Sequence, residues 1–296
     1  MGTNTFHLLI ATVEGGHFYI AHREKVPVKI GVGGINRNLI TDDAIARALK
    51  TMKAFKETLV EAGVSKILAF GTSALRNATN GKDVTNLIEV ETGIKTNIIQ
   101  GVQEAEYICF GARTAIAMGD KKHLIMDIGG GSVEFIIANA TEIFWSYSFE
   151  IGGQRLLERF QKSDPIRPEE IKALFSFFDE ELKLLFDQLH KHKPETLVGS
   201  SGTFDTLSDI YCFRNNIPVT ELPETPFSLK AFDKIYEELL IKDRTARMQI
   251  PGMIEMRVDM IVVACCLIRY LLNAYRFADI RVSSYSLKEG VLAMLI

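Results

Sequence analysis

Residues Leu124–Ala138, with the sequence LIMDIGGGSVEFIIA, decide the fold of this chain. An apolar run interrupted by one acid leads into three glycines and a serine, and a second β-branched and aromatic run follows. This pattern predicts two strands joined by a tight glycine turn rather than a helix. The turn leaves backbone N–H groups open and allows positive φ, so it can wrap around an anion. Its residues are Gly129, Gly130, Gly131 and Ser132.

Two carboxylates flank this turn. Asp127 ends the first strand and Glu134 lies two residues after Ser132. Amides and a hydroxyl suit phosphate oxygens, and carboxylates suit a divalent cation such as Mg²⁺. The alternative is a plain glycine hairpin with exposed acids. The turn is not a P-loop, because the Gly-Lys-Ser/Thr ending is absent.

The N-terminus repeats this pattern. MGTNTFHLLI at residues 1–10 has a glycine, then Thr3, Asn4 and Thr5, then an apolar strand. The two copies lie about one domain length apart, as expected for a duplicated architecture. Two facing turns, one from each domain, would grip a polyanion from both sides.

Length and composition set the limits. A chain of 296 residues favours two domains, and 47% hydrophobic with 24% charged residues is typical of a soluble globular protein. The net charge of −3 predicts no DNA, RNA or anionic membrane partner, so local groups must hold an anion. The four cysteines lack CxxC spacing and predict a reduced, cytoplasmic protein. The most apolar run, 260–272, is too short to span a bilayer.

Two further turns follow predicted strands. A short buried strand at 66–70 leads into GTSALRNA, where Arg76 is the candidate phosphate-binding guanidinium; the alternative is a solvent-facing arginine on a helix start. A strand at 196–198 leads into GSSGT, and a proline-bearing loop is predicted at 217–225. The GSSGT candidates are Ser200, Ser201, Gly202 and Thr203; the alternative is a plain strand-to-helix turn capped by Thr203.

Glu104 lies at the predicted N-terminus of a helix that runs from about residue 103 to 118. The exposed amides there should stabilise its carboxylate and lower its basicity. Acids are also common in first helical turns for stability alone.

DIGGGSVE, GTNTFHLLI, GTSALRNA and GSSGT together resemble the exopolyphosphatase / guanosine pentaphosphate phosphatase family, which belongs to the acetate kinase, sugar kinase, Hsp70 and actin superfamily. The resemblance covers nearly the whole chain with the motifs in order. It implies an α/β fold of two ribonuclease-H-like (actin-like ATPase) domains, each a mixed sheet flanked by helices, with the active site in the cleft between them. We expect an N-terminal domain at 1–120 and a C-terminal domain at 121–296.

The resemblance also implies roles. Glu104 matches the family glutamate that orients or deprotonates the attacking water, Arg76 matches a family arginine, and the GSSGT turn contacts phosphates in the superfamily. Lys288 replaces a family arginine. Family members carry an aspartate shortly before the position of Gly2, and this sequence lacks that aspartate. We expect that the start of the sequence is displaced, rather than that the residue has been lost. Mg²⁺ is the expected cofactor and a homodimer the expected assembly.

The sequence therefore predicts a Mg²⁺-dependent phosphoanhydride hydrolase. Its substrate is inorganic polyphosphate or guanosine pentaphosphate, between which the sequence does not choose. Two alternatives remain: a phosphotransferase of the same superfamily, for which no acceptor-site signature is visible, and a non-catalytic sensor that binds polyphosphate or guanosine tetra- or pentaphosphate.

Overall fold

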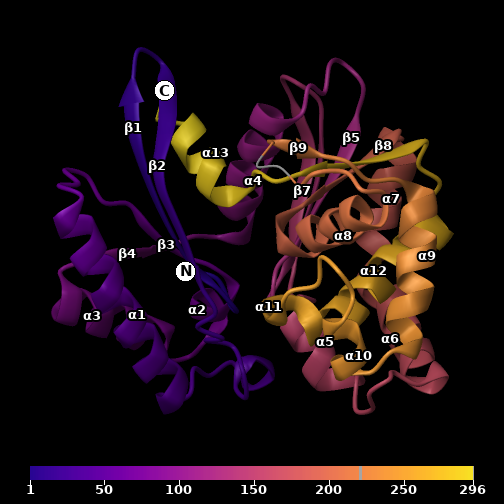
Figure 1. Cartoon of the computed structure of the whole chain (residues 1–296), viewed down its shortest axis with the longest axis horizontal. Helices are drawn as coiled ribbons and strands as arrows, with labels where there is room; N and C mark the ends of the chain where they lie inside the picture. Colours follow the sequence, from indigo (N-terminus) through magenta and orange to yellow (C-terminus); the bar gives the residue numbers. More distant parts are fainter. Residues whose placement is uncertain (220–221, 296) are drawn as a thin grey trace.

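The computed structural model describes residues 1–219 and 222–295, which form two lobes side by side (Figure 1). We call residues 1–100 the N-terminal lobe and the described residues from 101 onward the C-terminal lobe. The two differ in size and in the completeness of their sheets.

The C-terminal lobe is built on a six-stranded sheet with the order β7-β6-β5-β8-β10-β9. Strands β5, β6 and β7 form an antiparallel meander, and β8 and β10 continue the sheet parallel to β5. An antiparallel triplet followed by parallel strands is the ribonuclease-H-like arrangement, so the predicted fold class is confirmed. The strands are β5 His123–Ile128, β6 Val133–Ala138, β7 Ile143–Phe149, β8 Thr196–Ser200, β9 Glu224–Thr225 and β10 Asp279–Ser283.

Side chains alternate between the two faces of this sheet. In β5, Leu124, Met126 and Ile128 belong to the large core, whereas Ile125 packs on α4 (Gly101–Ala115) with Ile108 and Ala112 of that helix. The large core is completed by helices that follow in the chain: α5 Gly153–Phe160, α6 Pro168–Glu181, α7 Lys183–His192, α8 Ser201–Arg214, α9 Leu229–Ile241, α10 Arg244–Met248, α11 Glu255–Val258 and α12 Ile261–Ala274.

Helix α4 also packs closely on α13 (Leu287–Ala293). A Cβ at Gly290 would lie 1.7 Å from the Tyr107 carbonyl oxygen, and one at Gly111 would lie 2.2 Å from that of Ser286, so the backbones touch. Helix α13 lies between the N-terminal hairpin and the large sheet (Figure 1). The domain boundary predicted after residue 120 stays a prediction.

The N-terminal lobe contains two two-stranded sheets, an antiparallel hairpin of β1 and β2 and a parallel pair of β3 and β4. The first residues connect them: the Met1 amino group donates to the Phe70 carbonyl at 2.6 Å, and the Gly31 amide donates to the Thr3 carbonyl at 3.0 Å. The elements are β1 Phe6–Glu14, β2 His17–Val26, a 3₁₀ turn Ile35–Arg37, α1 Asp42–Glu61, β3 Ala69–Gly71, α2 Ser73–Asn77, α3 Gly81–Thr92 and β4 Thr96–Ile98.

Two local predictions need correction. The strand expected at 66–70 is limited to Ala69–Gly71, and Ile67 and Leu68 are exposed, because residues 65–68 have no strand partner in the described structure. The loop expected at 217–225 ends in the short strand β9, and its residues 220–221 lie outside the described residues. None of the described helices is long and apolar enough to cross a bilayer.

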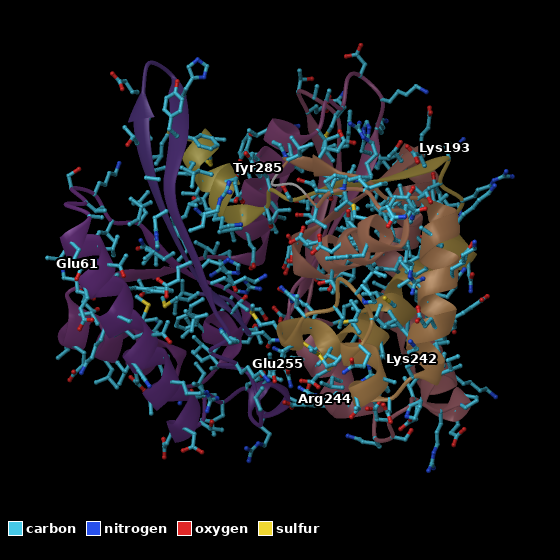
Figure 2. All side chains as sticks on the ribbon, in the orientation of Figure 1. Glu61, Lys193, Lys242, Arg244, Glu255 and Tyr285 are labelled. Carbon is cyan, nitrogen blue, oxygen red and sulfur yellow. The ribbon has the colours of Figure 1, made fainter. Side chains whose placement is uncertain are left out.

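A surface contact joins the lobes close to Arg244 and Glu255, which Figure 2 labels in its lower half. Arg244 lies beside Glu255 there and donates to Asp259 at 2.8 Å, and Asp259 lies 3.9 Å from Lys29 of the N-terminal lobe. Such exposed pairs contribute little to stability.

Candidate active site

The two glycine turns predicted from the sequence pack directly against each other. A Cβ at Gly131 would lie 2.5 Å from the Thr3 hydroxyl, and one at Gly130 would lie 2.7 Å from Asn4 Oδ1. The glycines are therefore required for close approach. The turn does not use the positive φ that glycine allows, because none of Gly129–Gly131 adopts it. The two turns lie together as predicted, but the expectation that they grip an anion between them is wrong, because they are in direct contact and both line the wall of one cavity.

The turns lie on the wall of one cavity of about 950 Å³ between the lobes. A cavity of this size can hold a ligand much larger than phosphate. The predicted site residues that line it are Thr3, Asn4, Thr5, Glu104, Asp127, Gly129, Gly130, Gly131, Ser132, Glu134, Ser201 and Gly202. The other three, Arg76, Ser200 and Thr203, are not among the described residues that line it.

Asp127 and Glu134 are opposite each other in the β5–β6 ladder, which places both side chains on the α4 face of the sheet. They are 5% and 1% exposed, so the alternative of exposed acids on a hairpin is excluded. Burial raises the pKa of Asp127. Hydrogen bonds from three serine hydroxyls oppose this shift because they stabilise the charged form, and the Ser286 hydroxyl donates to Asp127 at 2.5 Å. Burial, together with Glu104 and Asp127, raises the pKa of Glu134 well above its ordinary range.

Glu104 lies in the first turn of α4 and is buried. Burial raises its pKa to about 7, although the Arg76 guanidinium donates to it at 2.8 Å and opposes the shift. The expectation that the helix N-terminus lowers its basicity is therefore wrong, because desolvation outweighs the helix amides. A carboxylate with a pKa near neutrality is suited to accept a proton from water.

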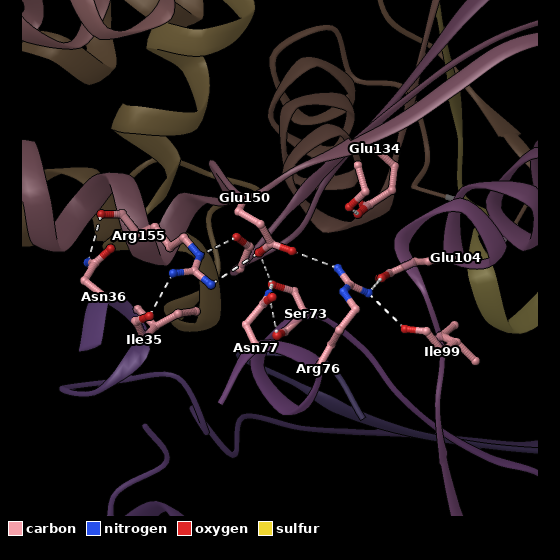
Figure 3. A network of polar contacts seen from close by, with 12 residues as sticks. Ile35, Asn36, Ser73, Arg76, Asn77, Ile99, Glu104, Glu134, Glu150 and Arg155 are labelled. Carbon is pink, nitrogen blue, oxygen red and sulfur yellow. Dashed lines mark hydrogen bonds and ion pairs between the residues drawn. The ribbon is translucent and has the colours of Figure 1, made fainter. Parts of the chain in front are cut away.

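Arg76 is not the solvent-facing arginine of the alternative interpretation, since its side chain is only 10% exposed. Figure 3 shows it held between two carboxylates. Its Nη1 donates to Glu104 and to the Ile99 carbonyl, and its Nη2 donates to Glu150 Oε1 at 3.0 Å. Arg76 thereby connects the N-terminal lobe to both α4 and the end of β7.

The GSSGT turn forms the start of α8. Ser200 is fully buried, with its hydroxyl 3.2 Å from Asp127, so it supports the carboxylate from behind. Ser201 adopts a φ of 72° and lines the cavity. A Cβ at Gly202 would lie 2.0 Å from the Arg257 guanidinium, so this glycine makes room for an arginine. Thr203 is buried in the first turn of α8, whose N-cap is Ser200 rather than Thr203.

The sequence missed a group of cations on the cavity wall. Lys25, Arg257 and Lys288 come from β2, α11 and α13 and line the cavity together with Asp205. Arg257 is 7% exposed, and its Nε has no hydrogen-bond partner within the described part of the chain. Burial lowers the pKa of Lys25 to about 8, and Arg257 contributes by repulsion. Arg257 is the buried member of this group, whereas Lys288 is 30% exposed and pairs with Glu289 at 2.9 Å. A buried cation is costly unless an anion joins it.

Different signals could have found these residues. Arg257 lies in the RVD segment before the long apolar helix, and Lys288 lies beside a capping box, so both stand in recognisable contexts. Lys25 faces the site only because it pairs with His7 in the hairpin register. No local pattern marks that placement.

The donors fit a hard divalent cation. Asp127 and Glu134 offer carboxylate oxygens on one face of the sheet. Asn4 Oδ1, which lies against Gly130 of the turn between them, is buried without a hydrogen-bond partner among the described residues. The described residues contain no group of three His, Cys, Asp or Glu side chains placed to hold a metal ion. Two carboxylates are still sufficient for Mg²⁺, which is commonly bound by one or two carboxylates, waters and substrate phosphates.

Comparisons with known proteins agree with this geometry. Residues 9–296 match the model of the Ppx/GppA phosphatase family. The crystal structure of an exopolyphosphatase from Cytophaga hutchinsonii is 43% identical, with a TM-score of 0.97 over 100% of this chain and 95% of that one. Exopolyphosphatase 1 of Mycobacterium leprae is 25% identical over 99% of this chain and 86% of its own length. An Aquifex aeolicus family member, 23% identical, shares the fold with a TM-score of 0.81 over 100% of this chain and 95% of that one. The chain belongs to the Ppx/GppA phosphatase family.

Proposed function

We propose that this protein is an exopolyphosphatase that hydrolyses the terminal phosphoanhydride bond of inorganic polyphosphate. The observation that carries the proposal is the meeting of the two glycine turns on the wall of the cavity that Glu104, Asp127 and Glu134 also line. Turn amides and hydroxyls hold an anion, and the carboxylates supply a base and a metal site. The relatives from Cytophaga hutchinsonii and Mycobacterium leprae are named exopolyphosphatases.

In this mechanism the turn amides and the hydroxyls of Thr3, Thr5 and Ser132 orient the terminal phosphate. Glu104 accepts a proton from a water molecule aimed in line with the leaving phosphate, and Arg76 holds the Glu104 carboxylate in place. Asp127 and Glu134 would hold Mg²⁺, with Asn4 Oδ1 nearby. When bound, the ion would neutralise charge on the phosphate oxygens.

The cations on the cavity wall support a substrate with several phosphates. The protein carries a net charge of −3, so a polyanion depends on local attraction. That attraction would come from the three cations that line the same cavity as the carboxylates, Lys25, Arg257 and Lys288. Guanosine pentaphosphate, which also ends in a phosphoanhydride, is the second candidate substrate. A cytoplasmic location and a homodimer stay predictions.

The test is release of inorganic phosphate from long-chain polyphosphate and from guanosine pentaphosphate, with and without Mg²⁺ and without any acceptor. Mg²⁺-dependent release from polyphosphate supports the proposal. Transfer that requires an acceptor alcohol would instead indicate a phosphotransferase. A polyphosphate that stays bound and intact in the presence of Mg²⁺ would indicate a sensor.

A further inference from the structure

A carboxylate from the C-terminal lobe occupies a set of donors that would suit a phosphate. Glu150 accepts from the Ser73 hydroxyl at 2.6 Å, from Arg76 Nη2 at 3.0 Å and from Arg155 Nη2 at 3.3 Å. Two guanidiniums and a hydroxyl are typical ligands of a phosphate oxyanion. Figure 3 shows Glu150 between the two arginines.

These donors lie at the edge of the glycine turns. A Cβ at Gly131 would lie 2.4 Å from Ser73 Oγ, and the Gly131 carbonyl accepts from Arg155 Nε at 2.9 Å. Ser73 also lines the cavity. The Glu150 side chain is 38% exposed, so it reaches the donors from the solvent side. An internal anion therefore lies next to the place where a terminal phosphate should bind.

We propose that Glu150 is a positioning residue that competes with the terminal phosphate for Ser73 and Arg76. In the structure described here, Glu150 holds Arg76 against Glu104 and links the two lobes. When a phosphate binds, it takes the Ser73 and Arg76 donors, and Glu150 keeps only Arg155. The exchange preserves the number of charge-assisted hydrogen bonds to Arg76, so the guanidinium is never left without an anion.

Glu158 provides a matched control on the same lobe. Its Oε1 accepts from the Gly33 amide at 3.0 Å, and its Oε2 lies 3.4 Å from Asn36 Nδ2, so it also links the lobes. In the described structure, the Glu158 side chain accepts hydrogen bonds from Gly33, Asn36 and Gln154, and from neither Ser73 nor Arg76. Glu158→Gln therefore removes one interlobe charge without changing the phosphate donors.

The experiment is calorimetric binding of inorganic phosphate to the wild type, Glu150→Gln and Glu158→Gln. We expect Glu150→Gln to lower the phosphate Kd about two- to fivefold, the range of an exposed ion pair, and Glu158→Gln to leave it unchanged. Glu150→Asp, which keeps the charge but is too short to reach both donors, should fall between the wild type and Glu150→Gln. A purely structural role would weaken phosphate binding in Glu150→Gln rather than strengthen it.

The proposal is overturned if the phosphate Kd of Glu150→Gln is unchanged or higher than that of the wild type. It is also overturned if Glu158→Gln strengthens phosphate binding equally, or if no variant binds phosphate. The inference rests on the proposed phosphatase function, but the two fail separately. The function fails if the wild type releases no phosphate from polyphosphate. The inference fails if the Kd ratio between Glu150→Gln and the wild type is not below one.

Discussion

At the scale of single residues, the burial of Glu104 determines the chemistry that the site can perform. A solvent-exposed glutamate is fully ionised at neutral pH but is a weak base. Burial raises the pKa of Glu104 to about 7. At pH 7 about half of the molecules therefore carry the carboxylate, which is basic enough to take a proton from water. Arg76 limits this shift by donating to the same carboxylate at 2.8 Å.

This pKa predicts the pH dependence of phosphate release. The carboxylate is the active form, and its pKa is raised, so the rate should increase with pH up to about 7 and then level off. Below pH 6 the rate should fall about tenfold per pH unit, measured as kcat/KM at fixed free Mg²⁺. A rate that is flat between pH 5.5 and 8 would contradict the role of Glu104 as a base.

The paired carboxylates Asp127 and Glu134 predict a response to Mg²⁺. A cation that binds only the folded state raises the melting temperature by mass action. We expect millimolar Mg²⁺ to stabilise the wild type, and Asp127→Asn and Glu134→Gln to abolish that shift in a thermal melt. Asp205→Asn is the control, because Asp205 lines the same cavity but lies among the cations. Equal shifts in all four proteins would contradict the assignment.

At the scale of elements, the turn between β5 and β6 works only because its residues lack side chains. A methyl group at Gly131 would lie 2.5 Å from Oγ1 of Thr3, a predicted phosphate ligand, and 2.4 Å from Ser73 Oγ, which we propose above as a further phosphate donor. Gly153 begins the nearby helix α5 and is different, since its Cβ would make only an ordinary contact at 3.4 Å.

These two glycines give a matched pair of variants. Gly131→Ala should cost about 1–3 kcal/mol of unfolding free energy by overpacking and should reduce phosphate affinity. Gly153→Ala should leave both quantities nearly unchanged, because alanine fits a helix there. Urea unfolding and phosphate binding measure the two effects. A Gly131→Ala protein that binds phosphate like the wild type would exclude direct packing of the two turns.

The sequence could predict elements whose signal is local. The glycine hairpin and the acid at the start of α4 are each marked by a few neighbouring residues, and both are present. The extent of the buried strand predicted at 66–70 was wrong, because strand pairing and burial depend on what packs against the segment. The raised pKa of Glu104 was missed for the same reason: burial is a property of the tertiary structure.

At the scale of the whole molecule, the site is shared by two lobes joined largely by polar contacts. Arg155 Nη1 donates to the Ile35 carbonyl at 2.7 Å, and Glu158 accepts from the Gly33 amide at 3.0 Å. No local sequence pattern announces such contacts, which explains why Glu150, Arg155 and Lys25 were not among the predicted residues. Polar interfaces of this kind are compatible with relative motion of the lobes during substrate binding and release.

The most direct test compares turnover with binding in Glu104→Gln, which is close to isosteric and removes the ability to accept a proton together with the charge that pairs with Arg76. In one preparation, phosphate release from polyphosphate and equilibrium binding of polyphosphate are measured beside the wild type. We predict that release falls by about 10²–10⁴-fold while Kd changes by less than about threefold. Near-normal release by Glu104→Gln would contradict the account, because the cleft would then hydrolyse its substrate without its proposed base.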